Sequence, residues 1–184
     1  MSAIDAMIAR HKELKGFLES HDEPSFRVEV DAYFRKLLVI SMGSFFERRL
    51  CSLVEEFLRN QNDDARAAEF GIVKGIKRQY HSWFAWERNN ANTFFALFGE
   101  TYKAKCEKEC ASNSELERAI RDFMKIGRTR NLLAHGDPAT TPMDDTLDEL
   151  EASFQSALRF VKFVEDEFRS TRRTRTPIWV EPTD

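Results

Sequence analysis

Apolar side chains recur along most of the chain at the three- and four-residue spacing that is typical of one face of an α-helix. Residues 2–19 carry five residues at this spacing: Ile4, Ile8, His11, Leu14 and Leu18. The segment HDEPS interrupts the pattern, and a long helix is predicted from about Phe26 to Arg59. Its stripe consists of eight positions: Tyr33, Leu37, Ile40, Ser44, Glu47, Leu50, Val54 and Phe57. Both segments predict helices that pack one face against the rest of the domain.

The middle of the chain is less regular and predicts shorter elements. The turn NQNDD precedes a short predicted helix from Ala65 to about Tyr80. The segment HSWFAWERNNANTFF predicts a loop followed by a helix that ends at about Cys110. No segment here or elsewhere predicts a strand.

A well-marked helix is predicted to start near Ser112 or Ser114 and to continue to about His135. Glu115 and Glu117 lie in its first turn, where acidic side chains favour the positive end of the helix dipole. Its apolar stripe contains five positions: Leu116, Ala119, Ile120, Phe123 and Ile126. The Gly-Asp-Pro segment that follows is a typical helix stop.

The last long helix is predicted to open with Thr141 as its cap and Pro142 at its first position. Its stripe contains six apolar residues: Leu147, Leu150, Phe154, Leu158, Val161 and Phe168. The basic, proline-containing segment TRRTRTPIWVEPTD follows, and we expect it to be a tail that is flexible or docks on a partner.

The sum of these elements predicts an all-α fold, an up-and-down bundle of about five to six helices. The 7 Gly and 5 Pro among 184 residues are few, which favours long helices over many short strands. The length favours one domain, and we expect it to span residues 1–170 with a basic C-terminal tail at 171–184.

Charge and cysteine content narrow the classes of function. The formal net charge is −3, so any contact with RNA must come from a local basic patch. No stretch approaches the ~20 apolar residues that span a bilayer, and the start of the chain carries no signal-like apolar run. The three cysteines are an odd number. We therefore expect a soluble, cytoplasmic protein with reduced thiols and no membrane contact.

Two charged residues occupy apolar stripes. Arg130 follows Phe123 by seven residues, and Glu47 lies seven residues after Ile40 and seven before Val54. An inward guanidinium and an inward carboxylate would lower each other's cost of burial, so we predict that Glu47 and Arg130 lie close together. The alternative is that each side chain reaches water from the flank of its helix.

His135 stands at the predicted helix end, where the helix dipole stabilises a protonated imidazole and so suits a proton donor. On an ideal helix His135 shares a face with Asn131 but lies about 140° from Arg130. Arg130 and His135 are therefore expected to meet only if the helix end unwinds or a second chain completes the site. A two-fold dimer would gather two of each in one groove.

The segment RNLLAHG resembles the hallmark of the HEPN superfamily, an arginine followed after four to six residues by a histidine. Arg130, Asn131 and His135 match this pattern late in a long helix, and the AHG ending is similar to the RiboL-PSP-HEPN branch. The segment SFFERRL around Glu47 is similar to an acidic position in an upstream helix of such proteins. The resemblance covers about residues 1–170 and implies a helical bundle of HEPN type.

The resemblance also implies a metal-independent endoribonuclease of toxin or phage-defence type, with no cofactor and no metal. Arg130 and His135 would be catalytic at a composite site in a homodimer, and Asn131 would orient His135 or the phosphate. Members of the family are commonly held in check by an inhibitory partner or act with a companion defence protein. In one subgroup a partner enzyme modifies a tyrosine two residues after the histidine; here Asp137 stands at that position, so that regulation is not expected.

Two other functions stay open at this point. The chain could be a non-catalytic HEPN module that binds RNA, a nucleotide or a protein. It could also be a plain helical interaction subunit in which Arg130 and Glu47 only fix the packing.

Four further signals have a functional and a structural interpretation. A basic stripe beside the motif could bind RNA phosphates or be a solvated face; it consists of Arg118, Arg121, Lys125 and Arg128. The basic segment TRRTR could likewise contact RNA. A dense aromatic set could stack bases, although core packing is favoured: Trp83, Phe84, Trp86, Phe94, Phe95 and Phe98. Cys106 and Cys110 could hold zinc with His81, but no second closely spaced ligand pair supports this.

Overall fold

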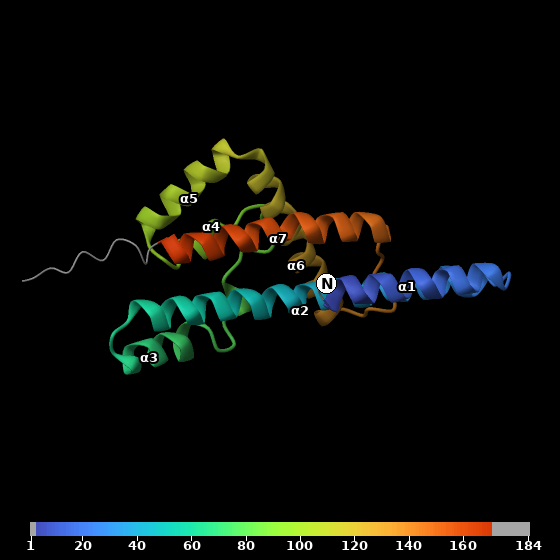
Figure 1. Ribbon diagram of the computed structural model, residues 1–184, viewed down its shortest axis with the longest axis horizontal. Helices are drawn as coiled ribbons and strands as arrows, with labels where there is room; N and C mark the ends of the chain where they lie inside the picture. Colours follow the sequence, from blue (N-terminus) through green and yellow to red (C-terminus); the bar gives the residue numbers. More distant parts are fainter. Residues whose placement is uncertain (1–2, 171–184) are drawn as a thin grey trace, which may run out of the picture.

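The computed structural model describes residues 3–170, and within this range the chain is helical without strands (Figure 1). It contains seven α-helices and one 3-10 turn: α1 (Ala3–Ser20), α2 (Pro24–Gln61), α3 (Ala65–Gly75), η1 (Tyr80–Ser82), α4 (Asn92–Ala96), α5 (Glu100–Ser112), α6 (Ser114–His135) and α7 (Leu147–Ser170). The predicted all-α fold is confirmed. The five-residue α4 and the separate α5 bring the number of helices to seven in this part of the chain.

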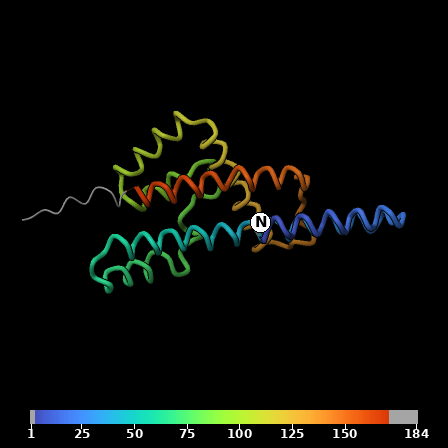
Figure 2. The backbone as a smooth tube through the Cα atoms, viewed as in Figure 1, coloured from blue at the N-terminus to red at the C-terminus, as the bar shows by residue number. Residues whose placement is uncertain are grey.

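Helices α2, α6 and α7 form the centre of the bundle. Glu115 at the start of α6 pairs with Arg159 of α7, and Lys125 farther along α6 pairs with Asp145 just before α7, so these two helices run antiparallel. Helices α2 and α7 run in the same direction, since Phe45 packs on Phe154 and Phe57 on Phe168. Figure 2 shows α1 folding back along the first part of α2, so that the two form a hairpin at one end of the molecule.

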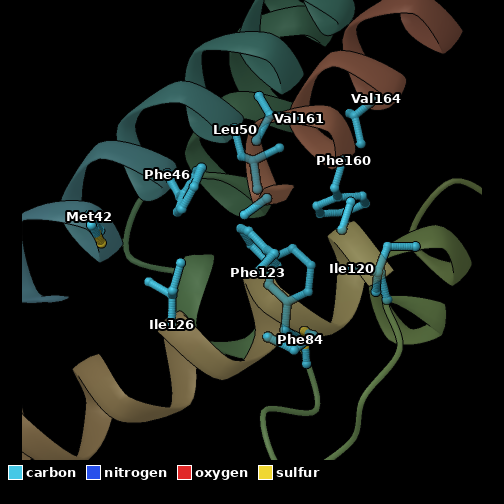
Figure 3. Packing of buried hydrophobic residues seen from close by; sticks show 14 of the residues in the cluster. Met42, Phe46, Leu50, Phe84, Ile120, Phe123, Ile126, Phe160, Val161 and Val164 are labelled. Carbon is cyan, nitrogen blue, oxygen red and sulfur yellow. The ribbon is translucent and has the colours of Figure 1, made fainter. Parts of the chain in front are cut away.

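The core between the central helices is aromatic. Phe123 of α6 points toward Phe46 of α2 and Phe160 of α7, with ring centroids 5.4 and 4.9 Å away (Figure 3). Phe84, from the irregular segment before α4, closes the same cluster at 5.0 Å from Phe123. All four rings are less than 5% exposed, and edge-to-face and tilted pairs of this kind add to the free energy of burial.

The start and end of α6 agree with the sequence. The side-chain oxygen of Asn113 caps the helix by accepting a hydrogen bond from the Leu116 amide at 3.1 Å. The five predicted stripe residues are all buried. The helix continues to His135 and stops before Gly136, as predicted.

The predicted start of the last helix is wrong. Helix α7 begins at Leu147, where Thr146 and Glu149 form a capping box: the Glu149 carboxylate accepts from the Thr146 amide at 2.8 Å, and Thr146 Oγ1 accepts from the Glu149 amide at 3.3 Å. Arg35 donates to the carbonyls of Met143 and Asp145. These bonds hold residues 141–146 in an irregular conformation, so Thr141 and Pro142 do not open a helix.

The predicted helix over residues 65–80 also ends early, at Gly75. The next residues turn sharply, and Arg78 has a positive φ of 62°. The Gly75 carbonyl, which a continuing helix would offer to the Gln79 amide, accepts from the Trp83 indole, and the Gln79 amide donates to the Ile76 carbonyl. Ile76 and Tyr80 are both buried on either side of this turn.

The stripe predicted along the first half of α2 is rotated relative to the one observed. Tyr33 and Leu37 are exposed, whereas Leu38, Met42 and Phe46 are buried. The reason is that α1 covers only one side of this part of α2. The predicted stripe of α1 itself holds through His11, and Leu14 beyond it is exposed.

The basic tail predicted for residues 171–184 lies outside the described residues. Among residues 3–170 there is no helix with both the length and the apolar character needed to cross a bilayer.

Candidate functional site

Arg130 lies on the face of α6 that packs against α2. Its side-chain stem rests on Gly43, and its Nη2 donates to Oε2 of Glu47 at 2.9 Å. The predicted proximity of Glu47 and Arg130 is therefore confirmed. The side chains are 37% and 26% exposed, so the ion pair stands at the edge of the core and the guanidinium remains open to solvent on one side.

Asn131 holds the same guanidinium from a second direction. Its side-chain oxygen accepts a hydrogen bond from Nη1 of Arg130 at 3.2 Å. The resemblance implies that Asn131 orients His135 or a phosphate. In the structure its observed bond is to Arg130, and Glu47 and Asn131 together fix the plane of the guanidinium.

His135 is the last residue of α6, and its imidazole is exposed. Helix α6 stays regular to this residue, with the Gly136 amide donating to the Leu132 carbonyl at 2.9 Å. Arg130 and His135 nevertheless border one groove of about 670 Å³. Of the two alternatives predicted from the sequence, the unwound helix end does not occur, because α6 is regular to His135. Completion of the site by a second chain stays a prediction.

The opposite wall of this groove comes from the turn after α3. The groove is lined by nine residues: Glu47, Cys51, Ile76, Lys77, Arg78, Tyr80, His81, Arg130 and His135. Three of them, Lys77, Arg78 and His81, are exposed and basic. The sequence pattern indicated only a weak zinc interpretation for His81 and did not single out Lys77 or Arg78, because nothing local predicts that this turn faces α6.

Two groups at the base of the groove are held protonated. Burial raises the pKa of Tyr80 well above its usual value, Glu47 and Cys51 add to the shift, and Arg130 opposes it. Burial also raises the pKa of Cys51 to about 11, with the negative charges of Glu47 and Glu55 adding to the effect. A neutral thiol is a poor nucleophile, so Cys51 is not suited to covalent catalysis.

A second groove of about 420 Å³ lies on the other side of the helix end. It is lined by Trp86, Glu87, Arg128, Asn131, Leu132, His135 and Gly136. His135 borders both grooves and stands on the ridge between them. Arg128, predicted to bind RNA, is half-buried here and forms no ion pair within residues 3–170.

The rest of the basic stripe is neutralised by carboxylates. Arg118 pairs with Asp122 at 3.6 Å and Arg121 with Glu117 at 3.4 Å. Lys125 forms an ion pair with Asp145 from the segment before α7. Of the predicted RNA-binding residues, Arg128 can bind a phosphate directly. Arg121 and Lys125 must first break their ion pairs with Glu117 and Asp145.

The dense aromatic residues between Trp83 and Phe98 belong to the core, which is the interpretation that the sequence favours. Trp83, Phe84, Phe94 and Phe95 are nearly inaccessible, and Trp86 and Phe98 pack against them. For the zinc interpretation, no group of three or more His, Cys, Asp or Glu side chains placed to hold a metal ion occurs in the described part of the chain.

The arrangement is suited to a phosphodiester. A fixed guanidinium can bind a non-bridging phosphate oxygen in a forked geometry, and neighbouring cations can bind the adjoining phosphates. An exposed imidazole can donate or accept a proton near neutral pH. These groups border one groove at the C-terminal end of α6.

Comparison with known families identifies a match over nearly the whole described chain. The model of the RiboL-PSP-HEPN family matches residues 5–170, which includes all of α2 to α7 and nearly all of α1. No match was found among curated proteins, and none among solved structures.

Proposed function

Since the chain belongs to the RiboL-PSP-HEPN family, we propose that it is an endoribonuclease that cuts RNA without a metal at the C-terminal end of α6. The observation that carries the proposal is the groove bordered both by Arg130, which Glu47 and Asn131 fix, and by the exposed imidazole of His135. The family supplies the reaction class, and the groove supplies the groups that the reaction needs.

In this reaction the RNA 2′-hydroxyl attacks the neighbouring phosphorus, and the bond from phosphorus to the 5′-oxygen breaks. Arg130 stabilises the additional negative charge on the phosphorane, and His135 takes part in moving the protons. The products carry a 2′,3′-cyclic phosphate and a 5′-hydroxyl. The RNA leaves the site past Arg128, with Lys125 and Arg121 farther along the same helix.

A homodimer is part of the proposal. Tyr33 and Leu37 are large apolar side chains that are 60% and 54% exposed, and they lie on the same face of α2 as Glu47. A second copy is the natural cover for this face, because it would bury the apolar residues and bring the two grooves together. Such a dimer would offer RNA two copies of Arg130 and His135.

One observation favours a second candidate, a non-catalytic HEPN module that binds RNA, a nucleotide or a protein. Both ends of the Arg130 guanidinium already have partners within the chain. An arginine satisfied in this way can serve packing alone. The two candidates differ in one measurable property: only the ribonuclease cuts RNA, so only its variants can lose RNA cleavage.

The test is incubation of the purified protein with RNA in EDTA, with wild type beside Arg130→Ala, Arg130→Lys and His135→Ala. We expect wild type to produce ends with a cyclic phosphate, and all three variants to lose at least about 100-fold in rate. Lysine keeps the charge but cannot present a planar fork, so Arg130→Lys should not restore activity. His21→Ala, at the far end of the α1–α2 hairpin, is the matched control.

Expression in cells tests the toxin role. Wild type should arrest growth unless an inhibitory partner is present, and His135→Ala should not. Intact RNA after incubation with a well-folded wild-type protein, or cleavage that EDTA abolishes, would refute the proposed reaction.

A further inference from the structure

We propose that His81 is a second catalytic residue of the same groove, the base that takes the proton from the RNA 2′-hydroxyl, and that Lys77 and Arg78 bind the adjoining phosphates. This inference rests on the proposed ribonuclease function and adds a substrate-binding wall to it. It assigns a role to the turn that follows α3 and includes η1, which the Arg130–His135 motif leaves unused.

The four histidines of the chain divide into two kinds. His11 is buried, bonded to Asp31 at 3.1 Å and stacked on Phe34. His21 bonds to the Phe17 carbonyl at 2.9 Å. The imidazoles of His81 and His135 form no hydrogen bond, ion pair or ring stack with any residue from 3 to 170, and both border the groove that contains Arg130.

The turn that carries His81 is fixed to α6. The indole Nε1 of Trp86 donates to the His81 carbonyl at 2.9 Å. The Trp86 ring lies so close to α6 that a Cβ at Gly127 would come within 1.9 Å of it. His81 is thus connected through one side chain to the helix that carries Arg130, which favours a defined position over a freely moving loop.

The other end of the turn is fixed as well. Trp83, buried, donates through Nε1 to the Gly75 carbonyl at 2.9 Å. Arg78 occupies the left-handed region, with φ of 62°, which costs energy for a residue with a side chain. This strained backbone places Arg78 on the groove, where it has no ion pair within the described residues. Lys77 reaches only a loose contact of 3.8 Å with Glu69.

The two imidazoles then have complementary tasks. In an in-line displacement the attacking and leaving oxygens lie on opposite sides of phosphorus, so the base and the acid act from opposite sides. His135, the last residue of α6, acts as the acid, and His81, on the opposite wall of the groove, acts as the base. As the 2′-oxygen bonds to phosphorus, its proton passes to His81. As the bond from phosphorus to the 5′-oxygen breaks, that oxygen takes a proton from His135. Water then exchanges protons with both rings.

The experiment compares the rates of wild type, His81→Ala, His81→Gln and His135→Ala on one RNA and on the same RNA with sulfur in place of the bridging 5′-oxygen at the mapped cleavage site. A thiolate leaves without a proton, so loss of the acid should matter little for the sulfur substrate. We expect both His81 variants and His135→Ala to cut the normal RNA at least about 100-fold more slowly. On the sulfur substrate His135→Ala should approach wild type, whereas the His81 variants should stay slow.

Gln79→Ala is the matched control, because Gln79 lies in the same turn but borders a different cavity. It should behave as wild type. Thermal unfolding of every variant separates loss of the fold from loss of catalysis. Because His81 is exposed, its substitution should leave the stability of the protein unchanged.

Each result has a distinct meaning. Cleavage by both His81 variants within about threefold of wild type, with His135→Ala inactive, would overturn this inference and leave the proposed function standing. Rescue of the His81 variants, rather than of His135→Ala, by sulfur would overturn the assignment of His81 as base. A wild type that cuts neither RNA would overturn the proposed function and this inference with it.

Discussion

Gly43 of α2 leaves the space that the stem of Arg130 fills. A Cβ at Gly43 would lie 2.6 Å from Cγ of Arg130 and 2.9 Å from its Cβ, which are contacts that no real side chain tolerates. We expect Gly43→Ala to push Arg130 away from Glu47, to destabilise the protein by about 1–3 kcal/mol through overpacking, and to lower RNA cleavage at least about tenfold. Urea unfolding and cleavage rates measure the two effects.

Gly16→Ala is the control for that substitution. Gly16 lies within α1, and no atom lies within 4 Å of the position that a Cβ would take there, so the change should stabilise the protein by about 0.5–1 kcal/mol through helix propensity alone. Its cleavage rate should equal that of wild type. Equal activity of the Gly43 and Gly16 variants would show that Arg130 does not need its observed position.

Trp86→Phe tests how His81 is positioned. Phenylalanine keeps a ring over Gly127 but cannot donate to the His81 carbonyl, so we expect a loss of about 0.5–1.5 kcal/mol in stability and a lower cleavage rate. If the loss in rate acts through His81, it should vanish in a His81→Ala background. Additive effects of the two substitutions on the rate would contradict that coupling.

Salt dependence tests the phosphate contacts. With cleavage blocked by His135→Ala, the logarithm of the RNA affinity should fall with the logarithm of salt concentration, and each phosphate contact to a single strand contributes about 0.7 to the slope. Adding Arg78→Ala or Arg128→Ala should each reduce the slope by about that amount. Arg66→Ala, an exposed residue that pairs with Asp64 at the start of α3, is the control and should leave the slope unchanged.

Helix α6 and its motif could be predicted because the signals there are local. Asn113, the acidic first turn and the glycine stop all lie within the helix or next to it. The pair between Glu47 and Arg130 could be predicted for a related reason: each charge interrupts an apolar stripe, and burial makes an oppositely charged partner necessary.

The other wall of the groove could not be predicted, because it depends on tertiary contacts. Nothing near His81 in the sequence reveals that Trp86 reaches Gly127 of α6, a contact between residues far apart in the chain. The predicted start of α7 is wrong for the same kind of reason. Thr141 and Pro142 resemble a helix start, but Arg35 of α2 binds the carbonyls that follow them.

The hairpin of α1 and α2 should depend on pH through Asp31. Burial alone would raise the pKa of Asp31, but the hydrogen bond from His11 and the charges of Lys15 and Arg35 outweigh it and lower the pKa below its usual value. A carboxyl with a lowered pKa in the folded state stabilises the protein above its unfolded pKa of about 3.9 and loses that contribution as pH falls through the folded value.

We therefore expect Asp31→Asn to destabilise the protein at pH 7 and to show a shrinking difference from wild type below about pH 4. Urea unfolding of the two proteins at pH 7 and at pH 3 measures this difference in stability. Asp22→Asn, in the exposed turn between α1 and α2, is the control. An Asp31→Asn effect of equal size at pH 7 and pH 3 would mean that the carboxylate charge is not what stabilises the hairpin.

The thiols report on the charge of Glu47. Burial raises the pKa of each of the three cysteines to about 11, and at Cys51 the carboxylates of Glu47 and Glu55 add to the shift. At pH 8 a thiol with such a pKa is only about 0.1% ionised, against about a quarter for an unperturbed cysteine. Ellman's reagent should therefore react at least about 100-fold more slowly with the folded protein than in urea.

Glu47→Gln removes a negative charge that disfavours the Cys51 thiolate, so it should speed the reaction of one thiol with Ellman's reagent. Combining Glu47→Gln with Cys51→Ser should abolish this faster reaction and so identify the thiol as Cys51. Cys51→Ser alone should keep full ribonuclease activity, since a protonated thiol on the groove wall takes no part in the proposed chemistry. Rapid modification of a native cysteine, or loss of cleavage in Cys51→Ser, would show that the thiolate forms at the groove and that covalent chemistry must be reconsidered.

Glu47→Gln should also loosen Arg130, so the cleavage rate of this variant should fall even while Cys51 becomes more reactive.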